Sequence, residues 1–189
     1  MSLEHLWAGW RGEYVRSAGS PEGIDEEDRS APAGGDPCVF CRIAASGPPS
    51  ADNGVVWVGA HTFVVLNAFP YSSGHLMALP IRHIDALDQL TGPESSELWA
   101  AVRAGVVALG GAYAPEGVNL GANLGQAAGA GIPRHLHLHA VPRWVGDTNF
   151  MTSVGGTRVL PETLAVSWQR VVAAWPAEGS TEGTGGGID

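Results

Sequence analysis

Three histidines alternate with two leucines over five consecutive residues, His135-Leu136-His137-Leu138-His139. A β-strand would place the imidazoles on one face and the leucines on the other, whereas a helix would scatter them around its circumference. The chain holds 7 histidines, and this short stretch contains three of them, one residue before Val141-Pro142-Arg143-Trp144. The pattern therefore predicts a strand with one chemical face and one core face. The alternatives are an exposed histidine-rich strand and a metal-binding tract.

The central histidine of the row, His137, is the best candidate for a nucleophile. A neutral imidazole nitrogen is competent near pH 7, because its ordinary pKa is about 6.5. After attack on phosphorus it becomes a good leaving group, so it suits a reaction in two steps. His135 and His139 flank it on the same face, where they can donate hydrogen bonds to phosphoryl oxygens or hold the tautomer of the nucleophile.

A glycine-rich segment lies between Leu124 and the histidine row. Its small residues leave backbone N–H groups open to an anion, although a flexible turn is the alternative interpretation. Arginines also lie close in sequence to histidines, which suits a polyanionic small molecule. The candidate substrate-binding residues are Asn67, Asn123, Gly129, Ala130, Gly131, Arg82, Arg134, Arg143 and Trp144.

Composition narrows the class of protein. The chain has 189 residues, 44% hydrophobic content and a net charge of −9, which predicts one globular domain and argues against general nucleic-acid binding. No run of residues reaches the length of about 18 apolar residues that a membrane span needs, and no signal peptide is evident. We therefore expect a cytoplasmic protein without a membrane partner.

The elements that must position these residues can be read from hydrophobic spacing. Strands are predicted at 55–58, 62–67, 75–80 and 118–124, and the first two form a hairpin around Gly59-Ala60. Helices are predicted at 93–110 and 161–175, with a helix start or short turn at 84–90. Residues 1–16 read as an arm that packs on the domain or on a second subunit, and 17–37 as an acidic linker rich in glycine and proline. The domain itself spans 38–176, followed by a disordered tail at 177–189.

Three blocks of the chain resemble the histidine triad (HIT) superfamily of nucleotide hydrolases and transferases. His135 through Val141 fits its signature of histidines alternating with apolar residues at every position. The other two blocks are Cys38-Val39-Phe40-Cys41-Arg42-Ile43, and Asn67 followed by Gly74-His75-Leu76-Met77-Ala78-Leu79-Pro80-Ile81-Arg82-His83. They follow in the right order and spacing, which makes a chance match very unlikely. The N-terminal arm, the Ala128–Gly131 loop and the segment from Pro142 to Met151 are similar to the actinobacterial diadenosine tetraphosphate phosphorylase branch.

The resemblance implies an α+β fold, an antiparallel sheet with packed helices, in a homodimer or homotetramer. It also implies that His75 helps to orient the catalytic histidines. The sequence departs from the family at one point, because Ile132-Pro133 stands where a Gly-Gln-Ser or Gly-Gln-Thr run usually supplies a hydroxyl. That hydroxyl matters most for a poor leaving group such as an amine. The departure therefore favours a dinucleoside polyphosphate over a phosphoramidate substrate.

The only two cysteines of the chain, Cys38 and Cys41, form a C-x-x-C pair. Taken alone, the pair could be half of a zinc site, a redox pair or two core thiols. In family members that keep it, two histidines complete a ligand set, which here would be His83 and His135. The resemblance thus implies a structural zinc site that commits His135 to metal.

Together these features predict nucleotidyl transfer on diadenosine tetraphosphate through an AMP–histidine intermediate at His137, resolved by inorganic phosphate to give ADP and ATP. Water as the acceptor would make the protein a hydrolase. The same residues would also suit a nucleoside phosphoramidate hydrolase, which the missing hydroxyl disfavours. A non-catalytic nucleotide sensor is disfavoured by the intact triad, because a protein that only binds needs no nucleophile.

Overall fold

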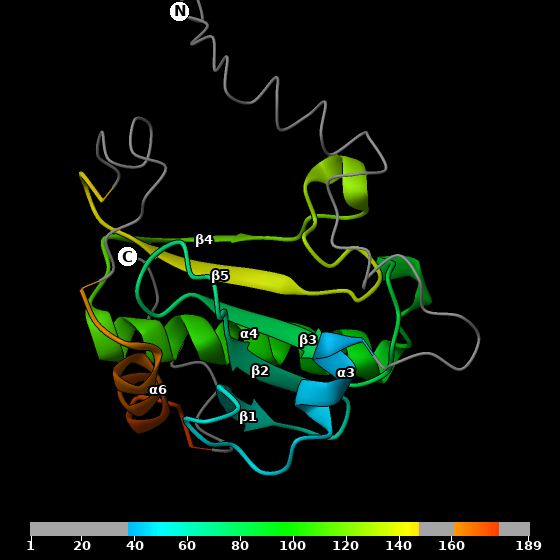
Figure 1. Cartoon of the computed structure of the whole chain (residues 1–189), viewed down its shortest axis with the longest axis horizontal. Coiled ribbons are helices and arrows are strands. Elements are labelled where there is room, and N and C mark those ends of the chain that lie inside the picture. The colour runs from blue at the N-terminus through cyan, green and yellow to red at the C-terminus, as the bar shows by residue number, and fades with distance from the viewer. Residues whose placement is uncertain (1–37, 148–160, 178–189) are drawn as a thin grey trace, which may run out of the picture.

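The computed structural model describes residues 38–147 and 161–177. Five strands form one antiparallel sheet in the order β1-β2-β3-β5-β4 (Figure 1). Their bounds are Val55–Val58 (β1), Thr62–Leu66 (β2), Leu76–Pro80 (β3), Gly117–Gly121 (β4) and Leu138–Arg143 (β5). The predicted antiparallel α+β fold is confirmed. The predicted arm and linker lie outside the described residues, as does the predicted tail beyond residue 177.

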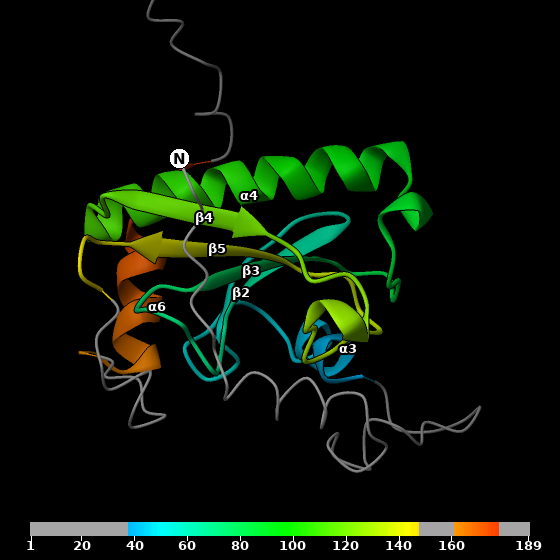
Figure 2. The ribbon, with the colours of Figure 1, turned by 90° about the horizontal axis from the view of Figure 1, so that it is seen from above.

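Helices cover both faces of the sheet. The long helix α4 (Gly92–Tyr113) runs along one face, and the short α3 (Val39–Ala44) lies on the opposite face (Figure 2). Helix α6 (Leu164–Ala173) packs against α4 and β1. Two 3₁₀ turns, η1 (Leu87–Gln89) and η2 (Gln126–Ala128), complete the elements. Within 38–147 and 161–177, no helix combines the length and apolar character needed to cross a bilayer.

Strand β2 contributes side chains to two hydrophobic clusters, one on each face of the sheet. All five of its residues are buried. Val64 and Leu66 join the cluster under α4, whereas Phe63 and Val65 join a second cluster that contains Phe40 of α3. Because side chains alternate along a strand, a run of consecutive apolar residues is what a sheet covered on both faces requires.

The capping residues explain why one predicted helix start agrees with the structure and the other does not. Thr91 and Glu94 form a capping box at the start of α4, so the helix begins close to the predicted residue 93. Helix α6 begins later than the predicted residue 161, because the hydroxyl of Thr163 accepts a hydrogen bond from the N–H of Val166 and so marks the helix start. Trp168 Nε1 then donates to the carbonyl of Val55 at 2.7 Å, which ties α6 to the edge strand β1.

The histidine strand was predicted with the correct side chains on each face but with the wrong first residue, since β5 begins only at Leu138. The register with β3 would place Leu136 opposite Pro80, and proline has no N–H to donate to the ladder. The N–H of Leu136 bonds instead to the carbonyl of Ile84 at 2.6 Å. Leu136 and Leu138 lie in the cluster under α4, while the rings of His135 and His137 contact Phe40 on the other face.

Gly74, immediately before His75, is expected to tolerate no side chain. Its φ is +80°, and a Cβ atom there would lie 2.5 Å from Tyr113 Cε2. Gly125 has a matching φ of +78° but open space around it. We expect Gly125→Ala to cost about 1–2 kcal/mol through backbone strain alone, and Gly74→Ala to cost about 1–3 kcal/mol more through overpacking. Denaturant unfolding of both variants measures the difference, and equal losses would contradict this account.

Candidate functional site

His137 is buried, lies between the buried His135 and the half-buried His139, and has a defined tautomer. Its Nδ1 lies 2.7 Å from the backbone carbonyl of His135. A carbonyl only accepts, so Nδ1 carries the proton and Nε2 keeps its lone pair. Burial lowers the pKa of His137 below its ordinary value, which keeps the ring neutral near pH 7. His137 therefore presents an unprotonated nitrogen held in one orientation.

His75 and His139 form a second hydrogen-bonded pair beside the nucleophile. His75 Nδ1 lies 3.1 Å from the backbone N–H of Tyr71 and 3.3 Å from Asn67 Nδ2. The Asn67 amide is oriented because its Oδ1 accepts from the N–H of Phe69. Two donors therefore face His75 Nδ1, which leaves the proton of His75 on Nε2.

That proton sets the state of His139. His75 Nε2 lies 2.9 Å from His139 Nδ1, so His139 accepts on Nδ1 and carries its own proton on Nε2. Burial, with a smaller contribution from the charge of His137, lowers the pKa of His139 to about 4. The His137 and His139 rings meet edge to face with centroids 4.9 Å apart. A neutral N–H donor thus lies beside the nucleophile.

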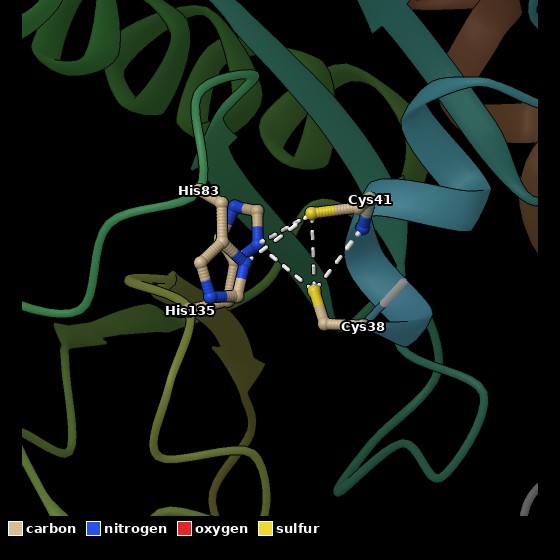
Figure 3. A group of neighbouring side chains, drawn as sticks. All are labelled: Cys38, Cys41, His83 and His135. Atoms are coloured by element: carbon tan, nitrogen blue, oxygen red, sulfur yellow. Dashed lines mark hydrogen bonds between the residues drawn. The ribbon is translucent and has the colours of Figure 1, made fainter. Parts of the chain in front are cut away.

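The metal candidates converge on one point (Figure 3), where Cys38, Cys41, His83 and His135 each offer a ligand atom and all four atoms lie within 4.8 Å of one another. Cys38 Sγ lies 3.3 Å from Cys41 Sγ and 3.2 Å from His135 Nδ1. His83 Nδ1 lies 3.3 Å from Cys41 Sγ. Ligand atoms of a tetrahedral zinc site are about 3.4–3.8 Å apart, so the set needs only a small expansion to hold the ion.

The surroundings of this cluster also fit zinc. His135 Nε2 lies 2.9 Å from the carbonyl of Pro80, so its proton is on Nε2 and the Nδ1 lone pair points at the thiols. Burial and the neighbouring Cys38 raise the pKa of Cys41 to about 11. A cation would reverse this shift, because it binds the thiolate form. Four protein ligands leave no position for a reacting water, so a bound zinc would be structural.

The candidate arginines Arg82 and Arg143 each form an ion pair within the protein. Arg82 Nε and Nη2 each lie 2.8 Å from a carboxylate oxygen of Glu94, and this pairing holds the pKa of Glu94 well below its usual range. Arg143 pairs with Asp147 at 2.6 Å and donates to Asn119. Both guanidinium groups therefore join elements of the fold in this structure. Arg134 is exposed at the end of the glycine-rich loop.

The remaining candidates lie on or near that loop. Asn123 Nδ2 approaches the carbonyl of Gly129 at 3.5 Å, and the N–H of Gly129 bonds to Gln126. Ala130 and Gly131 follow in an irregular segment. Trp144 lies farther along, with its ring edge-on to Tyr113 at 6.3 Å. The substrate contacts of all nine candidate residues remain predictions.

Sequence reasoning missed two aromatic neighbours of the histidines. Phe40 contacts His135 and His137 with ring centroids 5.6 and 5.3 Å away. Tyr71 lies 4.7 Å from His75 and 6.2 Å from His139. Phe40 lies inside the C-x-x-C pair, where the cysteines masked its packing role. The signal for Tyr71 was its place between Asn67 and His75, in a loop whose ends the sheet brings together.

Comparison with known proteins agrees with this geometry. The family model described as HIT domain matches residues 49–145. The chain is 37% identical over 175 residues to AP-4-A phosphorylase of Mycobacterium tuberculosis (strain ATCC 25618 / H37Rv), covering 92% of this chain and 85% of the relative. It is 30% identical to Protein hit of Bacillus subtilis (strain 168) over 107 residues, covering 57% of this chain and 71% of the relative.

Solved structures show the same fold. A Zn-bound histidine triad family protein from Mycobacterium smegmatis superposes with a TM-score of 0.58 at 26% identity, over 72% of this chain and 91% of that chain. A protein described as a hypothetical histidine triad nucleotide-binding protein from Sulfolobus tokodaii strain7 gives a TM-score of 0.59 at 23% identity, with the same coverage of 72% and 91%.

Proposed function

Because the chain belongs to the HIT family, we propose that it is a nucleotidyltransferase that cleaves diadenosine tetraphosphate with inorganic phosphate to give ADP and ATP. The observation that carries the proposal is the state of His137, whose Nδ1 proton is held by the His135 carbonyl at 2.7 Å so that Nε2 is free to attack. The relative of 37% identity that is named AP-4-A phosphorylase supports the choice of substrate.

In the first step, His137 Nε2 attacks the α-phosphorus of the dinucleotide. A nitrogen–phosphorus bond forms, the bond from that phosphorus to the bridging oxygen breaks, and ATP leaves with the electron pair. The Nε2–H of His139 donates to a phosphoryl oxygen as charge builds there. ATP is a good leaving group, so the reaction tolerates Ile132-Pro133 in place of a hydroxyl donor.

In the second step, an oxygen of inorganic phosphate attacks the same phosphorus. The new phosphorus–oxygen bond completes ADP, and the bond to His137 breaks and returns a neutral imidazole. A zinc ion bound by Cys38, Cys41, His83 and His135 would supply no reacting group, only a fixed position for His135. That residue in turn carries the carbonyl that orients His137.

Product analysis tests the choice of acceptor. Purified protein is incubated with diadenosine tetraphosphate in the presence and absence of inorganic phosphate, and the nucleotides are separated and quantified. We expect ADP and ATP, with ADP formation dependent on phosphate. AMP and ATP in both conditions would identify a hydrolase. Turnover of an AMP amide without turnover of diadenosine tetraphosphate would identify a phosphoramidate hydrolase.

We also propose that the protein is a homodimer that joins through β4. This strand ends the sheet order, and its outer edge pairs with no other strand among the described residues. Leu120 on β4 is 50% exposed. An antiparallel edge is complementary to a second copy of itself around a twofold axis. Light scattering is expected to give a dimer, or a tetramer built from it, and Leu120→Lys is expected to shift it toward the monomer.

A further inference from the structure

The loop between β2 and β3 is tied by hydrogen bonds next to the histidine row. The N–H of Asn67 bonds to the carbonyl of His75, and the N–H of His75 bonds to the carbonyl of Ser72. Ser72 Oγ donates to the carbonyl of Pro142 on β5 at 2.8 Å. The loop is therefore tied at both of its ends and to the strand that carries His139.

Tyr71 projects from this loop onto the two histidines. Its N–H donates to His75 Nδ1 at 3.1 Å. Its ring is tilted by 47° to His75 at 4.7 Å and by only 28° to His139 at 6.2 Å. These separations are within the range of about 4.5–7 Å at which aromatic rings attract one another. Tyr71 is half exposed, and its ring contacts both members of the histidine pair.

We propose that Tyr71 is a positioning residue that holds His139 in the orientation and the protonation state in which its Nε2–H is presented to the reacting phosphate. This inference rests on the proposed function only in naming phosphate as the group to which His139 donates. The arrangement of Tyr71, His75 and His139 is a property of the free protein.

The physical reason is which nitrogen carries the proton in the hydrogen bond between His75 and His139. His75 Nε2–H already points at His139 Nδ1, so a second proton on His139 would place two N–H donors face to face. The ring of Tyr71 keeps water from relieving that conflict and stops the imidazole from rotating. The titratable groups around His139 in the described residues are His75, His137 and Tyr71. Its strand partners Met77 and Gly121 carry no charge.

Histidine side-chain NMR on ¹⁵N-labelled protein tests the proposal without substrate. We expect wild-type His139 to be the Nε2–H tautomer and to remain neutral down to about pH 5. In Tyr71→Ala, which keeps the backbone N–H, we expect its pKa to rise by about 1 unit or more toward the ordinary value and both tautomers to be populated. Tyr71→Phe should behave as wild type, because only the ring is used.

Phe69→Ala is the matched control, because it removes an aromatic ring of the same loop that is 86% exposed and keeps the N–H that binds Asn67. It should leave His139 unchanged. If Tyr71→Ala fails to fold by circular dichroism, Tyr71→Leu gives the same comparison. An unchanged tautomer and titration of His139 in the folded variant, or equal effects of Tyr71→Phe and Tyr71→Ala, would overturn the proposal. Activity on any nucleotide does not enter this test, so failure of the proposed function would be seen separately.

Discussion

Replacing His137 with asparagine is expected to lower turnover of diadenosine tetraphosphate by roughly four to six orders of magnitude, because the variant lacks the attacking nitrogen. Asparagine can still donate to the carbonyl of His135 that His137 now contacts, so the backbone should keep its shape. We expect nucleotide binding, measured by calorimetry, to change by less than about tenfold. Loss of chemistry without loss of binding is the signature of a nucleophile.

His139→Asn is the comparison for this variant. It removes the neutral donor beside His137 but leaves the covalent route open, so a loss of about 10²–10³ in turnover is expected. A near-normal rate in His137→Asn would contradict the assignment of the nucleophile. A larger loss in His139→Asn than in His137→Asn would reverse the roles of the two residues.

Removing a ligand from the Cys38 cluster is expected to have the largest effect on stability. Elemental analysis should find about one zinc per chain in the wild-type protein, because four ligand atoms converge. Cys38→Ser should lose the metal and several kcal/mol of unfolding free energy, since metal bound only by the folded chain adds directly to its stability. A chelator should lower the melting temperature of the wild type but not of the variant.

Val39→Ser serves as the control for that experiment. It changes the neighbouring residue of the same helix, whose side chain is 37% exposed, without touching a ligand. It should retain zinc and lose less than about 1 kcal/mol. A structural zinc site would be contradicted if elemental analysis found no metal in the purified wild-type protein. It would also be contradicted if the Cys38→Ser variant were as stable as Val39→Ser.

The strands and the long helix could be predicted because their sequence signals are local. Thr91 and Pro93 mark the start of α4, and the hairpin of β1 and β2 turns at Gly59-Ala60. The start of β5 could not be predicted, because it depends on Pro80, a residue of another strand that supplies no donor to the ladder. Pairing between distant segments is invisible to a local pattern.

In the candidate site, too, some contacts could be predicted and others could not. Convergence of Cys38 and Cys41 with His83 and His135 was expected from the resemblance, and the four ligand atoms do meet. The pairing of Arg82 with Glu94 was not foreseen, because a capping glutamate and an arginine 12 residues earlier carry no shared motif. The tautomers of the histidines also depend on backbone carbonyls and amides, which no residue type reveals.

The most direct test of the central claim is to trap the covalent intermediate. Wild-type protein is mixed with diadenosine tetraphosphate without inorganic phosphate, quenched under alkaline denaturing conditions that preserve a nitrogen–phosphorus bond, and mapped by mass spectrometry of its peptides. The account predicts one adenylyl group on His137 that disappears when phosphate is added before the quench, with ADP formed in equal amount. Turnover without an adduct, or an adduct on a residue other than His137, would contradict it.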